Sequence, residues 1–543
     1  MDEKKDPMVP DGAVNPINTD YKVGQDNIVV NVGPFGLDIH NRVFAVSGLL
    51  VVAFVVLTLA FQNQVEPMFS GMRSWLTSNL DWFFLSAGNI FVLVCLAVAL
   101  SPLGRVRLGG TEAVPDYSYL GWFSMLFAAG MGIGLMFFGV SEPLSHFGSA
   151  MNGTVIENGV RTDWAPLAGA AGDAAAATRL GMAATIFHWA LHPWAIYAVL
   201  ALGLALFSFN KGLPLTIRSV FYPLLGERVW GWSGHVIDIL AVLATLFGLA
   251  TSLGYGAAQA SSGLNFLFGV PLGDTTQVLL VIGITAIALT SVVAGLDAGV
   301  KRLSEINMAI ALLLMLFVIF VGPTLDIAKG FFSNLVAYMQ YLPALASPFG
   351  RDDVNFSQGW TSFYWAWWIS WSPFVGMFIA RVSRGRTVRE FIVSVLIVPS
   401  LACVLWMTVF GETAIIQLVR DGYEAASKAE LPLQLFTMLD VLPLAQITSF
   451  IAIVLVVVFF VTSSDSGSLV IDVISAGGKV DAPLPQRVFW AVFEGLVAIA
   501  LILGGGLVAL QAMAVSTGLP FTVVLLVASM AILKGLASEP RVS

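Results

Sequence analysis

The stretch WTSFYWAWWISWSPF, residues 360–374, holds five of the fifteen tryptophans of the chain and no charged side chain. Apolar stretches of roughly 20 residues are long enough to cross the ~30 Å hydrocarbon core of a membrane. Such stretches recur along nearly all of the 543 residues, of which 57% are hydrophobic and 11% are charged, whereas about 25% are charged in soluble proteins. The sequence therefore predicts an all-α polytopic membrane protein.

Twelve transmembrane helices are expected, namely two peripheral helices followed by a ten-helix core of two five-helix repeats. The expected spans are residues 42–62, 81–101, 119–147, 183–208, 236–268, 276–296, 304–323, 359–380, 390–410, 449–470, 487–505 and 508–533. An odd number of spans in each repeat makes the two repeats inverted relative to each other, which is typical of secondary transporters.

These spans define the expected domain organisation. The segments are a disordered N-terminal tail (1–40), two peripheral transmembrane helices (41–104), the first repeat (119–323), a linker with an amphipathic surface helix (324–357), the second repeat (358–533) and a short C-terminal tail (534–543). Placing both termini in the cytoplasm leaves seven of the 26 Lys and Arg residues in outer loops and fifteen in cytoplasmic segments, while four more precede or open the first span; such an excess is typical of cytoplasmic loops. No basic block indicates a nucleic-acid partner.

Each repeat is expected to begin with an interrupted helix. The first contains AAGMGIGLMFFG (residues 128–139), whose glycines each weaken a helix by about 1 kcal/mol. The second contains the tryptophan stretch, which is expected to break at Pro373. Backbone groups freed inside a membrane need a polar partner, which an ion or a substrate can supply. The alternative is that Gly130 and Gly134, a GxxxG pair, allow another helix to pack closely, and these residues alone favour that interpretation.

Two aromatic clusters indicate the chemistry of a ligand. On a helix, Trp360, Tyr364, Trp367, Trp371 and Phe374 form one stripe with Trp368 beside it. The segment HWALHPWAIY (188–197) adds three more rings around a helix opened near its proline. Stacked rings near the middle of a span suit a quaternary ammonium, held by cation–π attraction. Neither cluster contains a carboxylate, so a zwitterion such as a betaine fits better than a bare cation.

Three further groups of polar residues lie within the expected spans. His188 and His192 have a spacing that can bind a metal, but two histidines do not complete a zinc site, and packing or hydrogen bonding is favoured. Thr462 and Ser463 share a helix face with Phe459, where two hydroxyls and a carbonyl could bind a hard cation or bond back to their own helix. The carboxylates in or near spans could carry protons or form paired gate and helix-end groups; they are Glu142, Asp465, Asp472 and Glu494.

The sequence resembles the betaine/carnitine/choline transporter (BCCT) family from about Asn41 to Pro540. The segments that carry the resemblance are GMGIGLMFFGVSEPL (130–144), HWALHPWAIY (188–197), WAWWISWSPFVGMFIARVSRGRTVRE (365–390) and FFVTSSDSGS (459–468). The resemblance implies an inverted-repeat core of the sodium/leucine transporter type, alternating access and a homotrimer in the lipid of the inner (plasma) membrane.

The resemblance also implies roles for individual residues. The substrate-binding set is Trp189, Trp194, Tyr197, Trp367, Trp368 and Trp371, and the substrate path is Trp360, Phe363 and Trp365. The sodium set is Ala128 and Met131, through backbone carbonyls, with Phe459, Thr462 and Ser463. Thr245 and Phe374 match a second sodium site of betaine carriers, but Leu249 replaces its hydroxyl partner and argues against a second ion. Gly134 stands where proton-coupled choline-type members carry Asp, which favours sodium as the coupling ion.

We therefore expect a sodium-coupled symporter that imports a betaine-like zwitterion, such as glycine betaine or dimethylsulfoniopropionate, without any cofactor besides the coupling ion. Two alternatives within transport are a sodium-independent exchanger and a proton-coupled choline or carnitine carrier. A membrane enzyme is disfavoured because the chain has no P-loop, HExxH or GxSxG motif. A channel or an osmotic sensor is a further alternative, which non-saturating flux or signalling without flux would reveal.

Overall fold

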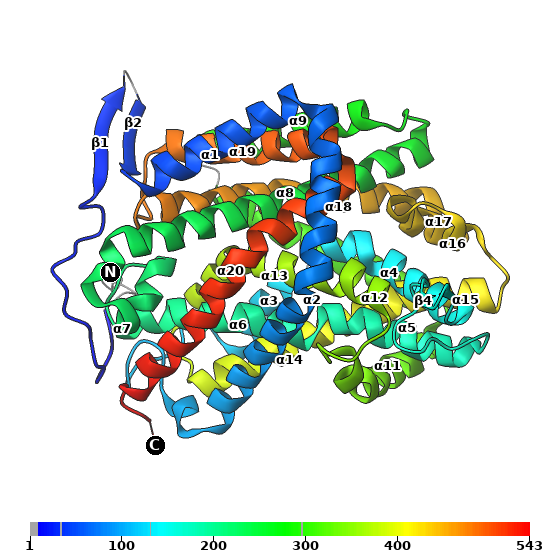
Figure 1. Ribbon diagram of the computed structural model, residues 1–543, viewed down its shortest axis with the longest axis horizontal. Coiled ribbons are helices and arrows are strands. Elements are labelled where there is room, and N and C mark those ends of the chain that lie inside the picture. Colours follow the sequence, from blue (N-terminus) through cyan, green and yellow to red (C-terminus); the bar gives the residue numbers. More distant parts are fainter. Residues whose placement is uncertain (1–8, 33–34, 131, 295–296, 543) are drawn as a thin grey trace.

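The computed structural model describes residues 9–32, 35–130, 132–294 and 297–542, and most of them are helical (Figure 1). The first part of the chain contains β1 (Asn27–Val32), β2 (Phe35–His40), α1 (Val43–Ala60), α2 (Gln62–Leu100), α3 (Tyr119–Gly130), α4 (Ile133–Asn152), β3 (Ile156–Glu157), β4 (Val160–Arg161), α5 (Ala174–Trp189), α6 (Leu191–Ala205), α7 (Tyr222–Leu225), α8 (Trp232–Phe268), α9 (Asp274–Val293) and α10 (Asp297–Val321). The second part contains α11 (Thr324–Leu345), α12 (Val354–Phe356), α13 (Ser362–Val382), α14 (Val388–Met407), α15 (Thr413–Val419), α16 (Ala425–Lys428), α17 (Gln434–Asp440), α18 (Ala445–Ser475), α19 (Leu484–Leu503) and α20 (Gly506–Ala537).

The helical segments confirm a polytopic all-α membrane protein. Within the described residues, ten helical segments are long and apolar enough to cross a membrane, and the bent pair α3–α4 makes eleven if it counts as one span. Helix α13 is not among them, because tryptophan, tyrosine, serine and proline score low on a hydropathy scale. It is nevertheless buried at the centre, where it packs against α6, α8 and α20. The count of twelve and the inverted repeats stay predictions.

Helices α3 and α4 form the interrupted helix expected in the first repeat. Helix α3 ends at Gly130, α4 begins at Ile133, and the two are bent by 66°. The low helical propensity of Gly130 and Gly132 favours a break at this point. The bend brings the first turn of α4 toward α8 and α13.

The expected break of α13 at Pro373 is wrong, since the helix runs without interruption from Ser362 to Val382. A proline cannot donate to the carbonyl four residues earlier, which here belongs to Ile369. The hydroxyl of Ser372 donates to that carbonyl at 2.7 Å. The neighbouring side chain thus satisfies the acceptor that proline frees, and the helix continues through the membrane.

The break between α5 and α6 lies at Ala190, three residues before Pro193. Proline is tolerated in the first turn of a helix, where its missing N–H has no intrahelical partner to lose. Two carbonyls at the end of α5 accept indole N–H groups instead of backbone amides. Trp368 donates to the His188 carbonyl at 2.8 Å, and Trp194 donates to the Trp189 carbonyl at 3.2 Å.

The N-terminal segment is not the disordered tail expected from its polarity. Strands β1 and β2 form an antiparallel hairpin at one edge of the helical body (Figure 1). The Asn27 side chain donates to the Ala476 carbonyl at 2.9 Å, and the Asp38 amide donates to the Gln486 side chain at 2.5 Å. Earlier in the segment, Asp11 pairs with Arg384 at 2.7 Å. We call residues 9–32 and 35–40 the N-terminal strap; its polar groups find partners on segments distant in sequence.

A buried histidine anchors the end of the strap. His40 is fully buried beside Arg218, which forms an ion pair with Asp238. Burial and the charge of Arg218 lower the pKa of His40 to about 3. The ring is therefore neutral at neutral pH, and its Nδ1 accepts hydrogen bonds from the backbone amides of Arg42 and Val43 at the start of α1.

Candidate substrate-binding site

The six residues of the predicted substrate-binding set line a single cavity of about 50 Å³, large enough for several water molecules. Trp189 ends α5, Trp194 and Tyr197 lie on α6, and the other three tryptophans lie on α13. We call these six residues the aromatic cage. The rest of the described lining is Ala129, Gly132, Ile133, Gly134, Leu135, Pro193, Ser252 and Cys403.

The rings of the cage pack on one another in a fixed arrangement. Trp367 and Trp368 are stacked, with ring centroids 4.8 Å apart and an interplanar angle of 15°. Trp189 lies edge-on to Trp368 at 4.9 Å, and Tyr197 lies edge-on to Trp194 at 5.4 Å. Aromatic pairs prefer such stacked and edge-to-face arrangements. The cage is thus largely preformed.

Every indole N–H of the cage is bonded to a fixed acceptor of the protein. Trp194 and Trp368 donate to the carbonyls at the end of α5, as described above. Trp371 and Trp367 both donate to the Gly248 carbonyl of α8, at 2.9 and 3.3 Å, and Trp189 donates to Glu142 at 2.7 Å. Because the N–H edges are occupied, the rings can offer a ligand their π faces. The described cavity lining contains no charged side chain.

Gly134 forms part of the wall of the cavity. A Cβ atom at this position would lie 2.8 Å from Cη2 of Trp189 and 3.3 Å from Cη2 of Trp367. The two rings can approach the backbone of α4 only because no side chain intervenes. From the sequence, Gly134 was connected with close helix packing and with the choice of coupling ion, but not with these two rings.

A second cavity, of about 340 Å³, lies beside the cage and includes two of the three predicted path residues. Trp360 and Phe363 line it together with Arg73, Trp164 and Gln511. The rings of Phe138, Tyr255 and Phe363 also line this cavity and pack on Trp367, with centroid distances of 6.0, 5.5 and 5.4 Å. These rings form a shared wall between the second cavity and the cage.

The structure does not bring Trp365 to either cavity. This side chain is fully buried on another face of α13, stacked on His192 with 5.3 Å between ring centroids. A Cβ atom at Gly88 of α2 would lie 2.5 Å from its Nε1. Trp365 therefore packs α13 against α2 and α6.

The predicted sodium residues lie on two parts of the structure. Ala128 is near the end of α3, whose main packing partners are α13 and α14, and Met131 lies outside the described residues. Phe459 and Thr462 are buried on α18, beside the partly buried Ser463. The Thr462 hydroxyl donates to the Val458 carbonyl at 3.0 Å, which leaves its lone pairs free to accept or to bind a cation.

Thr245, Leu249 and Phe374 are the positions that correspond to the second sodium site of betaine carriers. The surroundings of Leu249 are apolar. Thr245 is fully buried, and its hydroxyl donates to the Ala241 carbonyl within α8 at 2.7 Å. The Leu249 side chain packs directly on Gly467 of α18. Phe374 lies edge-on to Trp371 at 5.5 Å. Leucine thus fills space where a hydroxyl ligand would be needed.

The four carboxylates expected in or near the spans, Glu142, Asp465, Asp472 and Glu494, have polar partners. Asp465 pairs with Arg487 at 3.0 Å, the Gln486 amide donates to Asp472 at 3.4 Å, and the Ser464 hydroxyl donates to Glu494 at 3.3 Å. His192 bonds to Asn89 at 2.9 Å. Among the described residues, it does not belong to the group of potential metal ligands that contains His188. Glu142, His146 and His188 do place three potential metal-binding atoms within 4.8 Å of one another.

Comparison with known proteins identifies the family. The model of the betaine/carnitine/choline family transporters matches residues 42–541. The chain belongs to this family. A glycine betaine/proline/choline transporter of Vibrio parahaemolyticus is 73% identical, with 98% of this chain and 97% of the relative covered. A second transporter of that organism, named for glycine betaine, is 53% identical over 96% of this chain and 98% of its own length. The glycine betaine transporter OpuD of Bacillus subtilis is 39% identical over 92% and 95%.

Membership of the betaine/carnitine/choline transporter family confirms the resemblance stated above. The chain is a membrane transporter of a family of betaine-type solutes, and it is not an enzyme. The match includes both aromatic segments and the α18 segment.

Proposed function

We propose that the chain is a sodium-coupled symporter that carries a betaine-like zwitterion into the cell by alternating access. The observation that carries the proposal is the state of the aromatic cage, whose five indole N–H groups are all bonded to the protein. A trimethylammonium group makes no conventional hydrogen bonds and binds to ring faces, each desolvated contact being worth up to about 2 kcal/mol.

The uncharged lining favours a zwitterion over a bare cation. A carboxylate in the cavity would attract a choline-like cation and repel the carboxylate of a betaine. Three relatives named for glycine betaine are consistent with this preference, although one of them is also named for proline and choline. Glycine betaine is therefore the first solute to test, and dimethylsulfoniopropionate is the second.

Sodium would couple to the solute through α3 and α18. We assign the ion to the carbonyl of Ala128 and the α18 residues Phe459, Thr462 and Ser463, with Met131 as a further carbonyl ligand. An ion bound between the two helices stabilises one arrangement of the bent α3–α4 pair, which also carries the cage wall at Gly134. The ion and the solute then favour the same conformation, and each raises the affinity for the other. We also propose a homotrimer in the inner membrane, with both termini in the cytoplasm.

Uptake of labelled glycine betaine into proteoliposomes tests the proposal. We expect saturable accumulation with an inward sodium gradient and none when potassium replaces sodium. Equal accumulation in both conditions would contradict sodium coupling and favour an exchanger or another ion. A lack of uptake of both glycine betaine and dimethylsulfoniopropionate would contradict the assigned solute class.

Substitution of Gly134 by alanine is expected to raise the KM for the solute roughly tenfold, because overpacking a well-packed site costs about 1–3 kcal/mol. The added methyl group would displace the rings of Trp189 and Trp367. Gly148→Ala on the same helix is the matched control, since a Cβ atom there meets no other atom within 4 Å. Equal KM values for the two variants would contradict the placement of Gly134 in the wall.

A further inference from the structure

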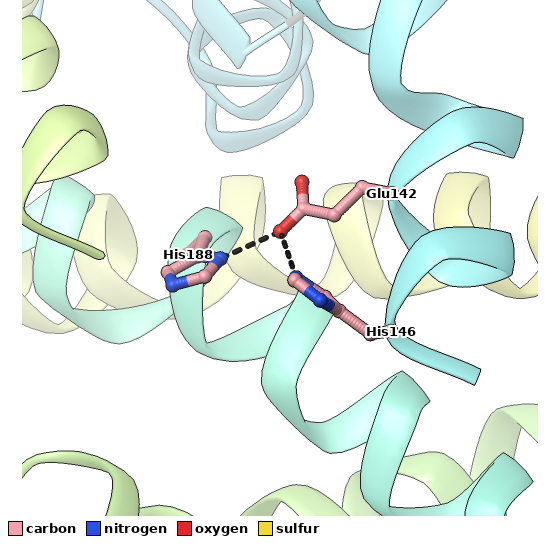
Figure 2. Close-up of side chains that lie close together, drawn as sticks. All are labelled: Glu142, His146 and His188. Atoms are coloured by element: carbon pink, nitrogen blue, oxygen red, sulfur yellow. Dashed lines mark hydrogen bonds and ion pairs between the residues drawn. The ribbon is translucent and has the colours of Figure 1, made fainter. Parts of the chain in front are cut away.

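Glu142 lies directly behind the aromatic cage and joins three helices. Figure 2 shows its carboxylate between His146 of α4 and His188 of α5. One oxygen, Oε1, bonds to Nδ1 of His188 at 2.6 Å and to Nε2 of His146 at 3.2 Å. The other, Oε2, accepts from the Trp189 indole at 2.7 Å and from the Tyr364 hydroxyl of α13 at 2.5 Å. The side chain is 0% exposed.

The four hydrogen-bonding partners of Glu142 indicate that its carboxyl group is ionised. The indole N–H of Trp189 can only donate, the Tyr364 hydroxyl donates, and each neutral imidazole can donate when its proton lies on the nitrogen that faces Oε1, so all four contacts can supply a proton from the partner. A carboxylate that accepts several hydrogen bonds is stabilised in its charged form. The same four bonds occupy both oxygens, which makes the group a hydrogen-bonded anion in this arrangement.

The bond to Trp189 connects this charge with the cage. Hydrogen bonds polarise one another in a low-dielectric interior, and donation from an indole N–H to an anion increases the negative potential of the ring face. That face attracts a cation through the same potential. The carboxylate itself is not part of the described cavity lining, whereas Trp189, to which it is bonded, is.

We propose that Glu142 is a specificity-determining residue that acts through Trp189. Its buried charge strengthens the attraction of the cage for the ammonium group of a zwitterion, while the intervening ring keeps it away from the zwitterion's carboxylate. The proposal rests on the proposed function, since it takes the cage as the site of a betaine-like solute.

A pair of isosteric ligands tests the proposal by isothermal titration calorimetry on the purified full-length protein with sodium present. Glycine betaine and 3,3-dimethylbutanoate have the same shape and carboxylate, but carbon replaces the positively charged nitrogen in the second. We expect the protein to prefer glycine betaine. In Glu142→Gln, the affinity for glycine betaine should fall about tenfold, while that for dimethylbutanoate is unchanged or higher.

Two further variants separate charge from packing. Trp189→Phe keeps a ring but removes the N–H donor, so it should lower the same preference, and Glu142→Gln should have a smaller additional effect in that background. His192→Gln is the control, because His192 is buried on the neighbouring helix and bonds to Asn89 rather than to Glu142. It should leave the preference unchanged. Trp189→Phe carries the test on its own if Glu142→Gln does not fold.

The outcomes distinguish this inference from the proposed function. An equal loss of affinity for both ligands in Glu142→Gln, or an unchanged preference in Glu142→Gln or Trp189→Phe, would overturn the role of Glu142 and leave the cage assignment standing. If the unmodified protein binds neither ligand, or binds the two equally, the cage does not recognise an ammonium group and the proposed function itself fails.

Discussion

Replacement of Trp371 by alanine is expected to abolish saturable uptake of glycine betaine at micromolar concentrations, with a loss of affinity of at least roughly 30-fold. This figure corresponds to one desolvated cation–π contact of about 2 kcal/mol. The Trp371 ring is only partly buried and lines the cavity, and its N–H is bonded to the Gly248 carbonyl. The substitution therefore removes a ring face from the cage with little disturbance of the core. Concentration-dependent uptake into proteoliposomes measures the effect.

The control for this substitution is a tryptophan outside the cage. Trp75 on α2 is 61% exposed, and Trp75→Ala should transport as the unmodified protein does. Trp371→Phe, which keeps a smaller ring, should lie between the two. Normal uptake by both Trp371→Ala and Trp194→Ala would contradict the cage as the solute site.

The double substitution Thr462→Ala, Ser463→Ala is expected to remove the sodium dependence of uptake. It deletes both proposed side-chain ligands from α18, and a hard cation needs oxygen ligands to replace its water shell. Uptake with an inward sodium gradient should fall to the level measured with potassium. Initial rates at several sodium concentrations test this expectation, since the unmodified protein should show a saturable rise.

The same helix provides a matched control. Thr448 is buried on α18, and its hydroxyl donates to the Leu444 and Ala445 carbonyls in the manner of Thr462. Thr448→Ala removes a comparable back-bonded hydroxyl far from the proposed site, so sodium dependence should be retained. A steep sodium dependence in the Thr462, Ser463 variant would place the ion elsewhere.

The composition of the cage could be predicted from sequence because helical spacing alone aligns Trp367 and Trp371. The family resemblance placed the separate segment around Trp189 in the same predicted binding set. The acceptors that orient these rings could not be predicted, since the Gly248 carbonyl and Glu142 belong to other helices. Every residue has a backbone carbonyl, so the sequence does not show which carbonyl accepts an indole N–H. The role of Gly134 depends on a tertiary contact with two rings.

The places where the structure differs from what the sequence suggested have local physical causes. Pro373 indicated a break, but the adjacent Ser372 supplies the hydrogen bond that prevents one. Trp365 was grouped with the path residues, although its position on the helix turns it toward α2 and α6. The polar N-terminal residues indicated disorder because their partners, such as Gln486, are distant in sequence. In each case the deciding group is a hydrogen-bond or packing partner that composition does not reveal.

The N-terminal strap imposes an order on biosynthesis. Asp38 leaves the ribosome well before its partner Gln486, which follows 448 residues later. At about 5–20 residues per second, the hairpin waits roughly 20–90 s for that partner. Docking of the β1–β2 hairpin of the strap can therefore be completed only after α18 has been synthesised and α19 has begun, and it is a late step in the maturation of each newly made chain.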